Sequence, residues 1–158
     1  MKEIGIGLIG TGFMGKAHAI AYRTALSAFP DIPTPRLVAV ADVNGDAAKK
    51  AAHQYGFETA TGDWKQLIAN PAVQVVSITT PNSMHKEMAL AAIATGKHVH
   101  CEKPLSPTLA DSLDMVKAAE ARGVCTQVGF NYIKNPLLKL ARQMVEAGHG
   151  DLVFVTSD

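Results

Sequence analysis

Three glycines near the amino terminus have the spacing of a phosphate-binding turn. The segment Gly10-Thr11-Gly12-Phe13-Met14-Gly15 fits the pattern G-x-G-x-x-G, between a predicted strand and a predicted helix. In this pattern the first glycine makes a tight turn, the second lets a pyrophosphate approach the backbone, and the third lets the helix pack closely on the strand. The first amides of the helix would face the anion. We therefore expect these six residues to bind a dinucleotide, the alternative being a glycine-rich turn without a ligand.

Asp42 is the second candidate, because it ends a β-rich run at 37–41. A carboxylate at this position can accept hydrogen bonds from the ribose hydroxyls of NAD, and it repels the 2′-phosphate of NADP. The separation from Gly15 exceeds the usual spacing of about 20 residues, and the proline-rich segment 29–36 explains the excess as an inserted loop. Arg36 could accept a phosphate instead, but we place it before the strand as a solvated surface charge. NAD is therefore expected rather than NADP, although a turn-capping role for Asp42 stays open.

Two further polar segments follow predicted strands. Thr80-Pro81-Asn82 comes after the run 73–79, and Glu102-Lys103-Pro104 comes after a strand that contains Val99 and Cys101. Pro104 restrains Lys103 to an extended backbone, and the end of a parallel strand would aim the lysine at a ligand crevice. Each segment has a simpler interpretation: a helix cap for Asn82, a bridge to a neighbouring loop for Glu102, and a surface position for Lys103.

The elements that must position these residues alternate along the chain. Apolar or β-rich runs at 4–9, 37–41, 73–79 and 124–129, together with the strand around 99–101, predict strands. Helical spacing, caps and breakers predict helices at 13–28, 47–55 after Asn44, 64–69 after Asp63, 84 to about 95 after Asn82 or Ser83, about 108–122, and 136–147. Because parallel strands joined by helices cross over right-handedly, this alternation predicts an α/β doubly wound parallel sheet, the Rossmann fold. Ligands bind such sheets at the carboxyl ends of the strands.

The glycine loop, Thr80-Pro81-Asn82-Ser83-Met84-His85 and Cys101-Glu102-Lys103-Pro104-Leu105 together resemble the glucose-fructose oxidoreductase, inositol dehydrogenase and rhizopine-catabolism family. The resemblance covers nearly the whole chain. It implies an NAD-dependent oxidoreductase that transfers a hydride between a nicotinamide and a hydroxyl of a sugar, cyclitol or related polyol. A nicotinamide-binding sensor or regulatory module without turnover is the alternative.

The same resemblance implies roles for individual residues. Lys103 would be the active-site lysine that hydrogen-bonds the reacting oxygen, and Glu102 would orient it or contact the cofactor. Thr80, Pro81 and Asn82 would line the nicotinamide side, with His85 at the mouth of the following helix. The segment 131–136 follows the last strand, where the family often carries an Asn-Tyr-Arg-like sequence, but Lys134 departs from it and we assign no catalytic residue there.

The family's second domain would supply the substrate wall and a homo-oligomer interface. We interpret 1–150 as the dinucleotide-binding domain and 151–158 as the truncated first strand of that second domain. The 158-residue chain alone is accordingly expected to bind the cofactor without oxidising a polyol, because no wall would hold a substrate against the nicotinamide.

Composition excludes several other classes. The net charge is +1, with 47% hydrophobic and 18% charged residues, so the chain has no basic stripe for nucleic acid or anionic membranes. The longest uncharged stretch, 66–84, contains prolines and amides and does not fit a membrane span. The absence of a leader pattern and the use of only two cysteines favour a cytoplasmic protein. His98 and His100 alternate on one strand face, but without further ligands we expect no metal site.

Overall fold

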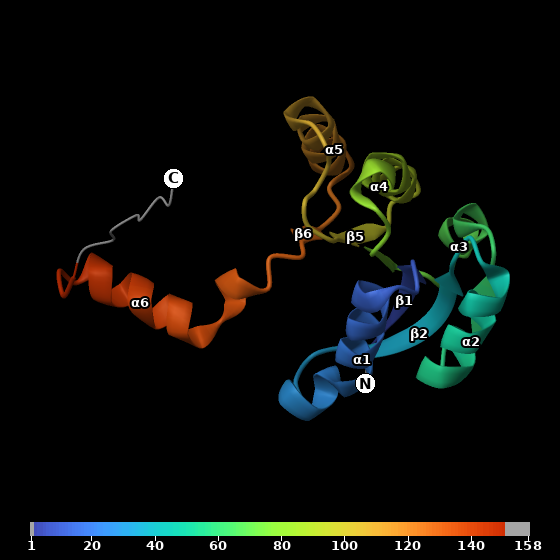
Figure 1. Ribbon diagram of the computed structural model, residues 1–158, viewed down its shortest axis with the longest axis horizontal. Coiled ribbons are helices and arrows are strands. Elements are labelled where there is room, and N and C mark those ends of the chain that lie inside the picture. The colour runs from blue at the N-terminus through green and yellow to red at the C-terminus, as the bar shows by residue number, and fades with distance from the viewer. Residues whose placement is uncertain (1, 151–158) are drawn as a thin grey trace.

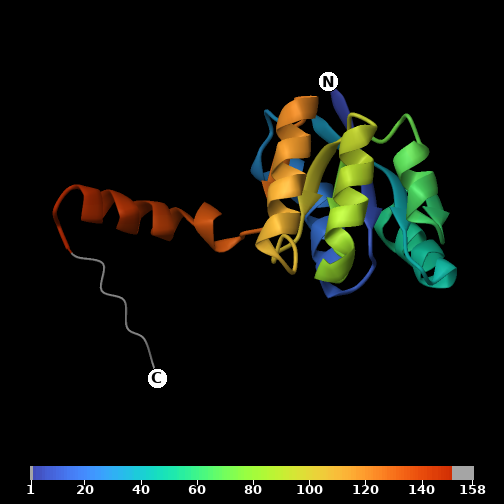
Figure 2. The ribbon, with the colours of Figure 1, turned by 90° about the horizontal axis from the view of Figure 1, so that it is seen from above.

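The computed structural model describes residues 2–150, which form one six-stranded sheet with helices on both of its faces (Figures 1 and 2). The strands are β1 (Glu3–Ile9), β2 (Thr34–Ala41), β3 (Thr59–Thr61), β4 (Val75–Ile78), β5 (His98–Cys101) and β6 (Thr126–Val128). The helices are α1 (Phe13–Ala28), α2 (Gly45–Tyr55), α3 (Trp64–Ala69), α4 (His85–Ala94), α5 (Leu109–Arg122) and α6 (Pro136–Glu146), with short 3-10 turns at Asn82–Met84 and Tyr132–Lys134.

The strand order is β3-β2-β1-β4-β5-β6, and all neighbouring strands are parallel. This order confirms the predicted Rossmann sheet, and it places the reversal of strand order between β1 and β4, where such folds bind ligands. One apolar cluster joins α3, α4 and α5 to the sheet, and a second cluster joins α1 and α2 to β1 and β2. In both views α6 extends away from the sheet and its covering helices (Figures 1 and 2).

Local capping explains five of the helix ends. The side chain of Asn44 accepts hydrogen bonds from two amides of α2, and Asp63 and Thr108 each accept one at the start of α3 and α5. Gly56 and Gly123 end α2 and α5 in the left-handed conformation. The caps at Asn44 and Asp63 agree with the sequence prediction, and Gly56 and Gly123 directly follow the predicted helices 47–55 and about 108–122.

The start of α4 differs from the prediction. Neither Asn82 nor Ser83 caps this helix with its side chain, because the 3-10 turn at Asn82–Met84 precedes it and the Met84 N–H bonds the Pro81 carbonyl instead. A backbone turn therefore occupies the place of the expected side-chain cap.

Two strands also differ. The edge strand β3 was not predicted, since Thr59-Ala60-Thr61 lies in no apolar or β-rich run. Strand β2 begins at Thr34, so Arg36 lies within the strand rather than before it. Pro35 is tolerated there because β3 pairs only with Ala39–Ala41 and leaves one side of the proline without a neighbouring strand.

Candidate functional site

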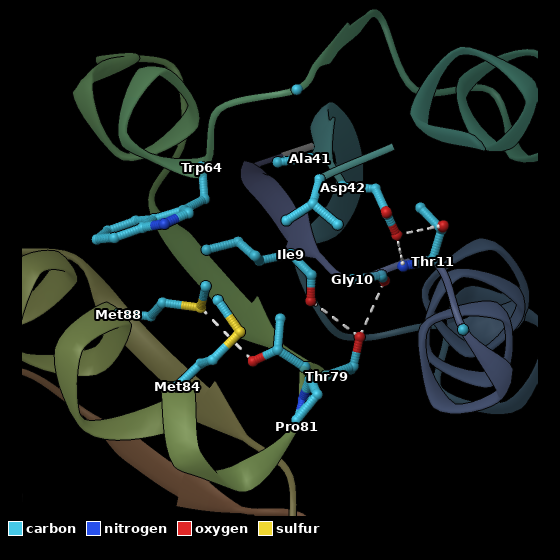
Figure 3. Close-up of a pocket in the computed structure, with 14 residues that line it drawn as sticks. Ile9, Gly10, Thr11, Ala41, Asp42, Trp64, Thr79, Pro81, Met84 and Met88 are labelled. Atoms are coloured by element: carbon cyan, nitrogen blue, oxygen red, sulfur yellow. Dashed lines mark hydrogen bonds between the residues drawn. The ribbon is translucent and has the colours of Figure 1, made fainter. Parts of the chain in front are cut away.

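A cavity of about 300 Å³ opens at the carboxyl edge of the sheet, beside the ends of β1, β2 and β4 (Figure 3). This volume lies within the range of small-molecule sites. Trp64, Met84 and Met88 form one side of it, and Asp42 with Thr11 forms the other. Its full lining is Ile9, Gly10, Thr11, Gly12, Ala41, Asp42, Val43, Gly62, Trp64, Thr79, Thr80, Pro81, Met84 and Met88.

The glycine loop has the geometry that its pattern predicts. Gly10 has a φ of +96°, and a Cβ there would lie 3.0 Å from the Thr79 carbonyl oxygen. A Cβ on Gly15 would overlap the Gly10 carbonyl oxygen, so this glycine permits the close approach of α1 to the loop. Gly12, by contrast, has no atom within 4 Å of an added Cβ. The open space at Gly12 is where a ligand can reach the backbone.

Asp42 joins the end of β2 to the glycine loop. Its Oδ2 accepts hydrogen bonds from the Thr11 N–H at 2.8 Å and the Thr11 hydroxyl at 2.6 Å, and its Oδ1 accepts one from the Asn44 N–H at 3.0 Å. Burial alone would raise the pKa of Asp42, but the bonds from Thr11 and Asn44 outweigh it and hold the pKa below the usual value. The Asp42 side chain therefore lines the cavity as a carboxylate at neutral pH, and its hydrogen bonds to Thr11 also order the turn beside Gly12.

The pKa of Asp42 has a consequence for stability. Because the folded-state pKa lies below the unfolded value of about 3.9, the stabilising effect of the carboxylate is present above that value and is lost as the pH falls through the folded pKa. We expect Asp42→Asn to lower the free energy of unfolding at pH 6, with the gap to the parent chain closing below about pH 4.

Urea unfolding followed at both pH values measures this gap, and Asp31→Asn, at an exposed carboxylate, is the control. A gap of equal size at both pH values would mean that the charge of Asp42 does not stabilise the fold.

The turn after β4 closes the cavity below the glycine loop. The Thr79 hydroxyl bonds the carbonyl oxygens of Ile9 at 2.9 Å and Gly10 at 3.0 Å, and thus ties the end of β4 to the end of β1. Thr80 and Pro81 line the cavity, whereas Asn82 does not. Phe13 is exposed at the start of α1, and its neighbour Met14 lies outside the cavity.

Glu102, Lys103 and His85 lie outside this cavity. Glu102 is buried, and Lys103 is exposed at the turn after β5, where its peptide bond to Pro104 is cis. His85 is also buried, with Nε2 2.9 Å from the Thr80 carbonyl oxygen and Nδ1 3.1 Å from that of Pro104. The imidazole therefore links the turns after β4 and β5 to each other, and this link places the Lys103 turn next to the cavity-lining turn.

The remaining candidates serve the fold. Burial raises the pKa of the Cys101 thiol to about 12, with Glu102 adding to the effect, so this thiol is not a nucleophile at neutral pH. His98 Nδ1 accepts the Cys125 N–H, and His100 Nδ1 lies 3.1 Å from the Tyr22 hydroxyl. Within residues 2–150 no three His, Cys, Asp or Glu side chains come together as metal ligands.

The chain is similar to known proteins over most of its length. The family model for an oxidoreductase family with an NAD-binding Rossmann fold matches residues 4–130 of the sequence. These residues include the whole glycine loop and the Lys103 turn. The chain belongs to this family. Within the described part of this oxidoreductase-family chain, no helix has the length and apolar content that a membrane crossing requires.

Relatives of this family member include characterised dehydrogenases. The chain is 42% identical to levoglucosan dehydrogenase of Pseudarthrobacter phenanthrenivorans, over 94% of this chain and 38% of that protein. It is 42% identical to inositol 2-dehydrogenase of Gluconacetobacter diazotrophicus, over 81% of this chain and 37% of that protein. A solved structure of levoglucosan dehydrogenase with NADH and levoglucosan superposes with a TM-score of 0.89 at 40% identity, covering 93% of this chain and 40% of that one. The chain thus spans about two fifths of the length of these relatives.

An NAD-binding oxidoreductase from Klebsiella pneumoniae is a further structural relative, with a TM-score of 0.87 and 49% identity over 92% of this chain and 39% of that one. The family and the Rossmann fold predicted from the motifs are thereby confirmed. The interpretation of 151–158 as the first strand of a second domain falls outside the described residues.

Sequence reasoning missed several residues of the site. Trp64, Met84 and Met88 line the cavity, and none of them was among the predicted site residues. His18 contacts Glu102, and Ser77 contacts His18, but neither residue was singled out. A signal for His18 was available, because it lies four residues after Met14 and is a polar residue on the otherwise apolar face of α1.

Proposed function

We propose that this chain is the cofactor domain of an NAD-dependent dehydrogenase that oxidises a hydroxyl of a sugar, cyclitol or related polyol. The observation that carries the proposal is the open backbone at Gly12, bordered by the ionised Asp42, in a cavity at the strand-order reversal. The names of the relatives support the substrate class, since they act on levoglucosan and inositol. A second domain that holds the substrate and forms a homo-oligomer belongs to the same proposal.

The described residues fit the parts of a dinucleotide. The space at Gly12 would take the pyrophosphate, and the lone pair of Asp42 Oδ1 that Asn44 leaves free would accept a hydroxyl of the adenosine ribose. The apolar side formed by Trp64, Met84 and Met88 suits the flat face of adenine. Bound NAD would supply the hydride acceptor.

The nicotinamide end would extend along the turns after β4 and β5. Thr80 and Pro81 would line this end, and Lys103, on the adjoining turn, would hydrogen-bond the reacting oxygen and assist its proton transfer. The Lys103 ammonium is exposed and has no ion-pair partner among residues 2–150, so it is available to a substrate.

The charges around the cavity support NAD rather than NADP. Arg36 pairs with Glu58 at 3.0 Å and approaches Glu3 at 3.7 Å, near the amino end of β2, whereas Asp42 follows its carboxyl end. Arg36 is therefore engaged at the opposite edge of the sheet from the cavity and would not meet a 2′-phosphate. Asp42 would repel that phosphate.

Titration with both reduced cofactors tests this preference. The chain contains a single tryptophan, Trp64, and it lines the cavity, so its fluorescence reports occupancy directly. We expect NADH to bind about tenfold or more tightly than NADPH, because the phosphate would meet a like charge. Asp42→Ala should narrow the difference, whereas Asp46→Ala, at an exposed carboxylate of α2, should preserve it. Equal or tighter binding of NADPH by the parent chain would refute the role given to Asp42.

A further inference from the structure

A buried polar cluster lies on the α1 side of the sheet, behind the Lys103 turn. Its members are His18 on α1, Ser77 on β4 and Glu102 at the end of β5, with 8%, 0% and 5% of their surfaces exposed. His18 Nδ1 is 2.8 Å from the Ser77 hydroxyl, and His18 Nε2 is 3.0 Å from Glu102 Oε1. None of these three side chains lines the cavity beside the glycine loop, whereas His18 and Glu102 border a second hollow, next to Gly129 and Lys134.

Both oxygens of Glu102 act as acceptors. Oε2 accepts the backbone N–H of Lys103 at 3.1 Å, while Oε1 faces His18 Nε2. In the tautomer that carries the proton on Nε2, His18 donates this N–H to Glu102 Oε1. Gly129 leaves room for this carboxylate, since a Cβ there would lie 2.6 Å from Oε1. Glu102 is thereby held between α1, the end of β6 and the turn that carries Lys103.

The cluster is also braced from its outer side. The ring of His100 stacks on that of His18 with centroids 4.6 Å apart, and the Tyr22 hydroxyl lies 3.1 Å from His100 Nδ1. Burial and the proximity of His18 lower the pKa of His100, which favours a neutral ring in this stack. His18 therefore has few alternative orientations, and a hydrogen bond from a fixed ring defines the position of its acceptor.

We propose that His18 is a positioning residue: through Glu102 it holds the backbone of Lys103, and so sets where the lysine leaves the sheet. The catalytic importance of this placement rests on the proposed function, in which Lys103 contacts the reacting oxygen. The placement of the Lys103 backbone does not depend on the proposed function, because the hydrogen bonds run from α1 through Glu102 to the Lys103 amide without a cofactor or substrate.

Amide hydrogen exchange of the chain, followed by NMR, tests the placement residue by residue. In the parent chain the Lys103 amide should be protected by its bond to Glu102. His18→Phe removes the donor and should speed exchange at Lys103 about tenfold or more, as expected for loss of support to a charge-assisted hydrogen bond. His18→Gln keeps an N–H donor and should restore much of the protection. His53→Phe, at an exposed histidine of α2, is the matched control.

The amide of Val76, in the buried strand β4, reports global stability in the same spectra. If His18→Phe does not fold, His18→Asn takes its place, because its shorter amide stops short of Glu102. An unprotected Lys103 amide in the parent chain would overturn the proposal. Unchanged exchange at Lys103 in His18→Phe, or in its substitute His18→Asn, would also overturn it. The same holds if this variant loses protection equally at Val76 and Lys103, or if His18→Gln exchanges at Lys103 as fast as it does. A failed cofactor titration would instead count only against the proposed function.

Discussion

In the complete protein, Lys103→Ala is expected to lower kcat about a hundredfold or more, with little change in the Kd for NAD. The lysine lies outside the cavity that would hold the adenosine and pyrophosphate, so its loss should not weaken the dinucleotide. Lys103 is exposed on the turn that His85 links to the turn after β4. From there its ammonium would reach the substrate oxygen that gains or loses a proton. Groups that transfer a proton in the transition state typically contribute 10²- to 10⁴-fold.

The measurement is NADH formation with levoglucosan and myo-inositol as probe substrates, alongside NADH titration of Trp64 fluorescence. Lys117→Ala, at an exposed lysine of α5, is the matched control and should leave both quantities unchanged. Full turnover by the Lys103 variant would place this residue among the surface lysines and remove it from the mechanism.

Gly12→Val is expected to abolish cofactor binding without weakening the fold. The backbone at Gly12 has a φ of −65°, which a valine can adopt, and the space around an added Cβ is empty in the folded chain. The free energy of unfolding should therefore stay close to that of the parent. The same space is where the pyrophosphate would lie, so the valine side chain and the ligand would compete for it.

Titration of Trp64 fluorescence with NADH and urea unfolding separate the two effects. Gly45→Val provides the control, because Gly45 also has open space around it but does not line the cavity. Gly15→Ala provides the contrast: its Cβ would overlap the Gly10 carbonyl, so it should cost about 1–3 kcal/mol of stability as well as binding. Normal NADH binding by the Gly12 variant would show that the ligand does not approach this backbone.

The features that could be predicted from the sequence are those that depend on neighbours along the chain. Asn44, Asp63 and Thr108 each cap a helix that starts at the next residue, so residue type and the following periodicity suffice to locate them. The glycine loop is local in the same way. Its three glycines lie within one turn and the start of one helix, and the structure gives each glycine the environment that its position in the pattern requires.

The parallel pairing of the strands also followed from chain-level rules, because helical connections between strands favour parallel neighbours with right-handed crossovers. The short strand β3 escaped these rules, since its pairing with β2 rather than its own pattern makes it a strand. The cap of α4 escaped them too, because residues 82–84 form a backbone turn that satisfies the helix start.

What required the tertiary structure is the set of contacts between residues distant in the sequence. Asp42 meets Thr11 across 31 positions, and His18 meets Glu102 across 84. The sequence placed Asp42 and Glu102 at strand ends, but it contained no information on which side chain each would face. That choice depends on the register between strands and on how closely α1 packs against the sheet, and both are set by the burial of apolar faces along their whole length.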